Sequence, residues 1–333
     1  MRACEGIVAS RAGREEREDP ETAAYTGVRE DFRGDPRRSS RPAQQIHPQA
    51  LSPPARPEIA EERLALWLLK ALSPPLPRAA PADPPRALAP FERRSVPRPG
   101  LSGPLAATWY PAEGPGRGVV LLLHPWIKGG QAYFHRGGRI PELREAGYHV
   151  ATVDLSGFGG SARGWGLPDR DLPPLLAALA EWAPGLPLHL WGVSFGGYWA
   201  HLALSARDGV AGAVFEDVSP HLLEYSARTA PRWCLAYATF RRLIPRAHRF
   251  LDLRRHASRL RVAAVGYVGG EADDSVPQAE TRDLARLAGA DCLIVPGAPH
   301  LGATRLARDT VVAFATAIFE RAERLWHGTC RTC

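Results

Sequence analysis

The sequence has almost no lysine: Lys70 and Lys128 are the only two among 333 residues. Its formal net charge of +7 therefore comes almost entirely from arginine. Abundant proline and glycine and a single methionine accompany this bias, a combination typical of a GC-rich coding sequence. The basic charge balance is therefore a weak argument for a nucleic-acid partner, and no recognition motif supports one. We expect no nucleic-acid binding.

Long apolar runs are also missing. The longest, residues 64–69 and 119–123, are far too short to cross a bilayer. The N-terminus lacks the apolar segment of a secretory signal, and the five cysteines suggest no disulfide framework. Cys330 and Cys333 form an isolated CxxC pair, which we interpret as part of a tail over residues 326–333 rather than as a metal site. The sequence predicts a cytoplasmic protein without a membrane span.

The first ninety residues differ in composition from the rest of the chain. Residues 1–60 are rich in Arg, Glu, Pro and Ser and show no periodicity, which predicts a disordered leader. Met1 is the only methionine, so no internal methionine start exists; from the unusual composition of this leader we also hypothesise that its start was assigned upstream of the true one. Residues 61–90 are expected to form an amphipathic helix over 61–72, followed by a proline-rich linker. Its apolar stripe, Leu64, Trp67, Leu68 and Leu72, is expected to pack on the domain.

From residue 91 to about 325, short apolar strands alternate with helices. Strands at 91–96 and 105–110, separated by Pro and Gly turn signals, predict an antiparallel opening pair. Further strands are expected at 118–124, 149–154, 188–193, 210–215, 262–268 and 292–295, and helices at 139–146, 172–182, 194–206, 278–287 and 303–325. This alternation predicts an α/β fold with a doubly wound, mostly parallel sheet.

The alternation is interrupted at residues 217–257, which show helical patterns and no strand. We interpret this insertion as a lid over the carboxyl edge of the sheet, where ligands bind in such folds. From Arg228 to Arg261 it carries ten arginines against one acid, Asp252. A solvated basic face explains this charge, and the alternative is a preference for an anionic substrate or an acidic partner surface.

The motif Gly192-Val193-Ser194-Phe195-Gly196 follows an apolar strand and precedes a helix-compatible segment. This arrangement predicts a nucleophile elbow, in which the serine occupies a strained turn and the two glycines avoid a collision. We expect the Ser194 hydroxyl to be exposed. We also expect the Phe195 N–H, at the start of the helix, to be free to bind an oxyanion.

A nucleophilic serine requires a base and an orienting carboxylate, and both occur downstream. His300 follows the strand at 292–295, and Asp273 follows the strand at 262–268. The order Ser, Asp, His is the one used by α/β folds with such an elbow. Asp217 and Asp274 remain alternatives for the acid.

Residues 91–325 resemble the α/β-hydrolase fold superfamily, as a serine esterase-like member with a helical lid. The resemblance rests on the elbow and on three further motifs: Asp154-Leu155-Ser156-Gly157-Phe158-Gly159-Gly160-Ser161, Gly270-x-x-Asp273-x-x-Val276-Pro277 and Gly297-x-x-His300. It implies that Ser194 is the nucleophile, Asp273 the acid and His300 the base.

The chain departs from the superfamily at the oxyanion loop. His124-Pro125-Trp126 stands where the superfamily usually has His-Gly-x. Proline has no N–H, but the resemblance assigns the donor to the next residue, so the Trp126 amide would accompany that of Phe195. The Trp126 side chain is expected to narrow or line the acyl pocket.

The sequence thus predicts a serine hydrolase that cleaves a carboxylic ester, or a related small acyl compound, through an acyl-enzyme on Ser194. No metal or cofactor is expected. Two alternatives remain: an acyltransferase that uses the same triad, and a non-catalytic binding protein with this fold.

Overall fold

The computed structural model describes residues 61, 64, 65, 67, 83–98, 103–127, 130–162, 168–229 and 232–330, without the side chains of 232–236 and 327–330. All of them belong to the unit formed by residues 46–333. The predicted leader, most of the linker and the end of the tail lie outside the described residues. No helix in the described ranges is long and apolar enough to cross a membrane.

An eight-stranded sheet forms the centre of this unit, in the order β1-β2-β4-β3-β5-β6-β7-β8. The strands are β1 (Glu92–Val96), β2 (Leu105–Tyr110), β3 (Gly118–Leu123), β4 (Tyr148–Val153), β5 (Leu188–Val193), β6 (Gly212–Glu216), β7 (Ala264–Gly270) and β8 (Asp291–Val295). β2 pairs antiparallel with β1 and β4, and all other pairs are parallel. The predicted doubly wound, mostly parallel sheet is confirmed.

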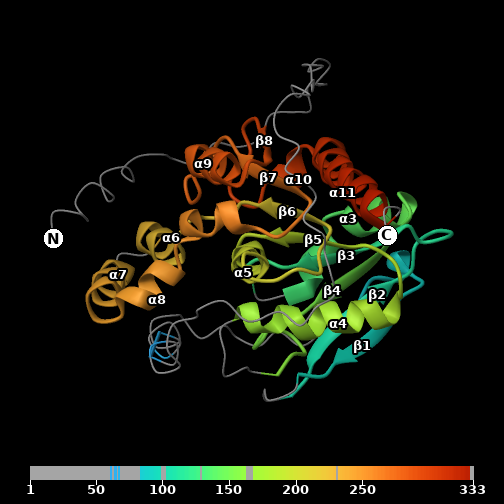
Figure 1. Ribbon diagram of the computed structural model, residues 1–333, viewed down its shortest axis with the longest axis horizontal. Coiled ribbons are helices and arrows are strands. Elements are labelled where there is room, and N and C mark those ends of the chain that lie inside the picture. The colour runs from blue at the N-terminus through green and yellow to red at the C-terminus, as the bar shows by residue number, and fades with distance from the viewer. Residues whose placement is uncertain are drawn as a thin grey trace. The chain divides into compact units, whose positions relative to one another are not determined.

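Helices cover both faces of the sheet (Figure 1). α3 (Arg139–Glu145) and α11 (Arg308–Cys330) pack on one face, and α4 (Leu172–Trp182), α5 (Phe195–Leu204) and α9 (Gln278–Ala288) on the other. Each face of the sheet has its own apolar core, and successive residues of β3 point alternately into the two. Val120 and Leu122 lie in the core beneath α3 and α11, and Leu121 and Leu123 lie in the core beneath α4, α5 and α9. A strand buried on both faces reads as a continuous apolar run, which explains why β3 was recognisable from the sequence.

The helix predicted at 303–325 is wrong in one respect, because two helices occupy this region. α10 (Ala303–Leu306) ends at Ala307, whose backbone leaves the helical region with φ −137° and ψ 53°, and α11 follows. The break lets Thr304 bond to Glu216 while α11 packs against β6 and β7. The other predicted elements appear with ends that differ by at most two residues.

The helix predicted at 61–72 contacts the domain, but the apolar stripe expected to face it is wrong at the described positions. Glu61, Leu64, Ala65 and Trp67 are helical, but Leu64 is 41% and Trp67 62% exposed, whereas Ala65 is buried. The Glu61 carboxylate accepts a hydrogen bond from the Ala247 N–H at 3.3 Å. Of the described positions, 61 and 65 therefore face the domain.

The predicted lid consists of α6 (Leu222–Thr229), α7 (Arg232–Leu243) and α8 (Pro245–Phe250), which lie together beyond β6 in Figure 1. An isolated β-bridge between His221 and Asp252 joins the two ends of this insertion. Buried side chains of Leu223, Phe240 and Leu253 connect it to the core beneath. Apolar contacts therefore hold the lid on the domain.

A buried ion pair lies below the carboxyl ends of the central strands. Nη2 of Arg139, on α3, donates to both carboxylate oxygens of Glu216 at 2.7 and 2.8 Å, and both side chains are almost fully buried. The Trp191 indole N–H and the Thr304 hydroxyl also donate to this carboxylate, at 2.9 and 3.0 Å. Four donated hydrogen bonds compensate the cost of burying the Glu216 charge.

We expect Arg139→Met to lower the free energy of unfolding by about 3–5 kcal/mol, because it leaves the Glu216 carboxylate buried without its counter-ion. Urea denaturation measures the change. Arg286→Met is the matched control: the Arg286–Asp283 pair is largely exposed, with side chains 71% and 40% accessible, so the loss there should stay below about 1 kcal/mol. Equal losses in the two variants would contradict the role given to the buried pair.

Candidate active site

Ser194 lies at the turn between β5 and α5. Its backbone has φ 46° and ψ −110°, a conformation that non-glycine residues rarely adopt. Two hydrogen bonds hold the turn: the Ser194 N–H donates to the Glu216 carbonyl at 2.7 Å, and the Gly196 N–H donates to the His124 carbonyl at 3.1 Å. A Cβ on Gly196 would lie 2.6 Å from that carbonyl oxygen, so only glycine fits. The structure thus places Ser194 on the sharp turn that the motif predicted.

The side chains of Ser194, His300 and Asp273 form a continuous hydrogen-bonded chain. The Ser194 Oγ is 3.2 Å from His300 Nε2, and His300 Nδ1 is 2.7 Å from Asp273 Oδ2. The second oxygen of Asp273 accepts the N–H groups of Ser275 and Val276, each at 2.8 Å. Asp273 is buried, and Ser194 and His300 are partly exposed. The geometry therefore aligns a carboxylate, an imidazole and a reachable hydroxyl.

The electrostatics of His300 suit a general base. Burial lowers the pKa of His300, but its hydrogen bond to Asp273 and the negative charges of Asp273, Asp217 and Glu216 outweigh this effect. The pKa is therefore raised above 6.5. A more basic imidazole removes the serine proton more readily, provided that it is neutral when substrate arrives.

We expect kcat/KM for ester hydrolysis to fall as the pH drops through the raised pKa of His300, because the protonated imidazole accepts no proton from Ser194. The midpoint of this acid limb should lie above 6.5, the value of an unperturbed histidine. Steady-state rates between about pH 5 and pH 9 measure it. A midpoint below that of free histidine would contradict the assignment of His300.

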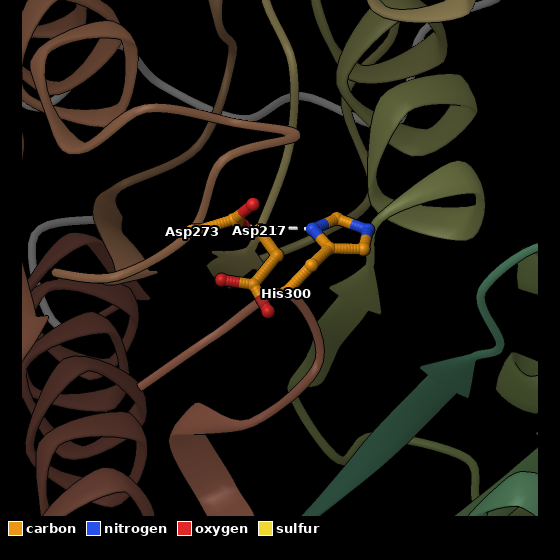
Figure 2. A group of neighbouring side chains, drawn as sticks. All are labelled: Asp217, Asp273 and His300. Atoms are coloured by element: carbon orange, nitrogen blue, oxygen red, sulfur yellow. Dashed lines mark hydrogen bonds and ion pairs between the residues drawn. The ribbon is translucent and has the colours of Figure 1, made fainter. Parts of the chain in front are cut away.

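The three acids that the sequence left open occupy different environments. Asp274 is exposed and forms no hydrogen bond with His300 among the described residues. Asp217 is buried, and its Oδ2 accepts the Leu301 N–H at 2.8 Å. Figure 2 shows both carboxyl groups on the same side of the His300 ring, with that of Asp273 above that of Asp217; the hydrogen bond from the ring runs to Asp273. Of the three, the structure bonds Asp273 to the imidazole.

These residues also offer atoms of the kind that bind metals. One oxygen each of Asp217 and Asp273 and one ring nitrogen of His300 lie within 4.8 Å of one another. However, both oxygens of Asp273 and both nitrogens of His300 already take part in the hydrogen bonds described above. The donor set is arranged for proton transfer rather than for chelation.

The sequence predicted the backbone amides of Phe195 and Trp126 as oxyanion donors. Phe195 is the first residue of α5, where an N–H has no partner within the helix. In the part of the chain that the structure describes, neither its N–H nor that of Trp126 donates a hydrogen bond. The His124 ring braces the Trp126 loop: its Nε2 accepts the Leu155 N–H at 3.0 Å, and its Nδ1 donates to the Pro125 carbonyl at 2.8 Å. Both amides thus remain available.

Aromatic rings line this side of the site. The Trp126 ring is 40% exposed and packs edge-on against Phe195 and Phe158, with ring centroids 4.7 and 5.4 Å apart. Behind the elbow, a small apolar cavity of about 10 Å³ is lined by Gly196, Trp199 and neighbouring side chains. It has room for about one water molecule, which is too little for an acyl chain. Among the described residues, the exposed face of Trp126 is an apolar surface beside Phe195 and the elbow.

The lid contributes side chains that the sequence did not single out. The Tyr225 ring, on α6, lies 5.7 Å from the His300 ring. One turn later, Arg228 forms a two-pronged ion pair with Glu280 at the start of α9. The spacing of Tyr225 and Arg228 indicated that they share one face of a helix. It could not identify what that face contacts, because the partners, His300 and Glu280, lie more than fifty residues away in the sequence. These contacts thus fasten α6 to the domain beside His300.

Part of the arginine excess in the lid is neutralised by acids elsewhere. Arg228 pairs with Glu280, Arg254 with Glu224 and Asp252, and Arg261 with Asp208. Arg241, Arg242 and Arg249 are exposed on α7 and α8. Fewer of these arginines therefore carry an unpaired positive charge than the count from the sequence implied.

Comparisons with known proteins agree with this architecture. A family model described as serine aminopeptidase, S33, matches residues 114–265. No curated protein matches the sequence. Among solved structures, an esterase of Pyrococcus furiosus superimposes with a TM-score of 0.60 and 16% identity, covering 74% of this chain and 98% of that one.

Two further structures share the fold at low identity. A thermostable carboxyl esterase of Bacillus coagulans has a TM-score of 0.54 and 19% identity, covering 68% of this chain and 98% of its own. A puromycin-hydrolyzing peptidase of Mycobacterium tuberculosis has a TM-score of 0.52 and 20% identity, covering 71% of this chain and 41% of its own. The chain therefore has the α/β-hydrolase fold, the superfamily that its four motifs resemble.

Proposed function

We propose that this chain is a serine hydrolase that cleaves carboxylic esters through an acyl-enzyme on Ser194. The observation that carries the proposal is the unbroken hydrogen-bonded chain from Asp273 through His300 to the Ser194 hydroxyl. His300 takes the serine proton as Oγ attacks the ester carbonyl, and Asp273 holds Nδ1–H and stabilises the imidazolium that forms. His300 then returns the proton to the leaving alcohol.

The N–H groups of Phe195 and Trp126 supply the second component of the mechanism. Negative charge develops on the carbonyl oxygen as Oγ adds, and two fixed amide donors stabilise it without reorganising. In the second half of the reaction, His300 removes a proton from water, which attacks the acyl-enzyme and releases the acid. The exposed face of Trp126 would hold the apolar part of the substrate.

A serine aminopeptidase is the second candidate, and the family match over residues 114–265 favours it. Such an enzyme must bind the positively charged amino end of a peptide. The two carboxyl groups closest to His300, Asp217 and Asp273, are buried and hydrogen-bonded within the protein. Exposed arginines on the lid disfavour a cationic substrate further. We therefore place the ester first.

An acyltransferase would use the same triad and differ only in the group that attacks the acyl-enzyme. Ser194 and His300 are partly exposed, so water reaches the site, and this supports hydrolysis. Adding alcohols to the ester assay tests the alternative: transfer predicts ester products that increase with alcohol concentration while acid release falls.

A fluorophosphonate probe followed by peptide mapping tests the proposal. We expect labelling of Ser194 and hydrolysis of p-nitrophenyl butyrate, with little release of p-nitroaniline from alanine p-nitroanilide. Faster cleavage of the anilide would favour the peptidase instead. Absence of both labelling and turnover would leave a binding protein as the better explanation.

A further inference from the structure

Asp217 lies next to the catalytic chain without belonging to it. It directly follows β6, has φ 52°, and is fully buried. Its Oδ2 accepts the N–H of Leu301, the residue after His300, and Leu301 itself has φ 61°. Two strained residues in contact show that the fold holds this carboxyl group and the His300 loop together at a cost in backbone energy.

The other oxygen of Asp217 has no partner. Oδ1 is buried and forms no hydrogen bond within the described residues. Asp217, Asp273 and His300 nevertheless present oxygen and nitrogen atoms within 4.8 Å of one another (Figure 2). A buried carboxylate is expensive unless something compensates its charge, and the cation that His300 becomes during catalysis is the nearest candidate.

The groups that act on the Asp217 charge lie on several segments of the chain. Glu216, next to it on the chain, repels it, but Arg139 neutralises much of that charge. Asp273 repels it and His300 attracts it, while the Tyr133 and Tyr225 hydroxyls remain neutral in this environment because their pKa values are raised. Burial, followed by the repulsion from Glu216, raises the pKa of Asp217 to about 7. This carboxyl group therefore changes charge in the range in which the enzyme would work.

We propose that Asp217 is a positioning residue that also acts electrostatically on the base. Its carboxylate form strengthens His300 as a base, and its protonated form withdraws that support. The inference rests on the proposed function. When the pH falls, Asp217 takes a proton from solvent and the imidazolium loses one of the negative charges near it. When the pH rises, the proton returns to solvent and the imidazolium regains that charge. Asp217 forms no bond to substrate at any step.

One substitution separates the two roles of Asp217, because asparagine can still position the His300 loop but carries no charge. Asp217→Asn retains an oxygen that accepts the Leu301 N–H but removes the charge. Asp274→Asn is the matched control, since Asp274 is an exposed carboxyl group adjacent to Asp273 in the sequence. A purely structural role for Asp217 predicts that all three proteins have the same pH profile.

The decisive experiment measures kcat/KM for p-nitrophenyl butyrate against pH in the wild type and both variants. In Asp217→Asn we expect the acid-limb midpoint to fall by about 0.5 to 1 pH unit and the plateau rate to fall by about 3- to 10-fold, since both report the same lost stabilisation of the imidazolium. Asp274→Asn should superimpose on the wild type. A wild-type profile in Asp217→Asn would overturn the proposal.

A second measurement does not depend on turnover or on the folding of a variant. Carbon-13 NMR of aspartate-labelled wild-type protein should show one side-chain carboxyl group titrating near pH 7, well above the ordinary value of about 4. If every aspartate titrates below about pH 5, the proposal is wrong even where hydrolysis is found. If one carboxyl group titrates near pH 7 but no ester is cleaved, the proposed ester hydrolysis is wrong, whereas the raised pKa of Asp217 is confirmed.

Discussion

Ser194→Ala is expected to lower kcat/KM for p-nitrophenyl butyrate by about 10⁴- to 10⁶-fold. The variant lacks the oxygen that attacks the carbonyl, so only the oxyanion donors and substrate binding remain. Those contributions account for a small residual acceleration over the reaction in water. Initial rates at saturating and subsaturating ester separate the loss of kcat from any change in KM.

The control for this variant is Ser205→Ala, at the far end of the same helix. The Ser205 hydroxyl donates to the Leu202 carbonyl and has no contact with His300 among the described residues. Its loss should leave the rate unchanged. If Ser194→Ala kept more than about a tenth of the wild-type rate, another nucleophile would have to be sought.

Asp273→Asn is expected to lower kcat by about 10³- to 10⁴-fold. The Asp273 carboxylate can only accept a hydrogen bond, so it keeps the proton of the neutral imidazole on Nδ1 and leaves Nε2 free to accept the serine proton. An asparagine can instead donate its amide N–H to Nδ1, which places the imidazole proton on Nε2 and blocks that transfer. The loss should appear in kcat rather than KM, because Asp273 is buried and does not reach the substrate. Stopped assays with high enzyme concentration make such a rate measurable.

The same assay ranks the two buried carboxyl groups. Asp217 lies close enough to His300 to influence it, but its Oδ2 bonds to Leu301 rather than to the imidazole. The loss in Asp217→Asn should therefore be at least about a hundredfold smaller than the loss in Asp273→Asn. The reverse order would transfer the role of triad acid to Asp217.

Local sequence was enough to predict the sheet and the sharp turn that carries Ser194. The run at 118–123 is apolar at every position because β3 is buried on both faces, and Gly192 and Gly196 flank a serine between a strand and a helix. The loops carrying Asp273 and His300 each follow a parallel strand, and parallel strands bring their carboxyl ends to one edge. These features depend on short stretches of chain.

Features that depend on partners distant in the sequence were not predictable. Asp217 was one of three possible acids until the fold placed its oxygen on the Leu301 amide, 84 residues away. Arg139 looked like one arginine among many, although it neutralises Glu216 across 77 residues. Ala65 is buried and Trp67 exposed, which the sequence could not predict because the surface near Ala247 comes from a distant part of the chain.

The crowded backbone at the elbow constrains how such a protein could diversify. A methyl group on Gly192 would come within 2.4 Å of the Gly197 Cα, and one on Gly196 within 2.6 Å of two carbonyl oxygens. Random mutation at these positions would damage the fold before it altered selectivity. Among the described residues, the partly open rings of Trp126 and Tyr225 are positions where substitution could change substrate preference without this steric conflict. The reactive centre is thus fixed by steric crowding, while its periphery is free to vary.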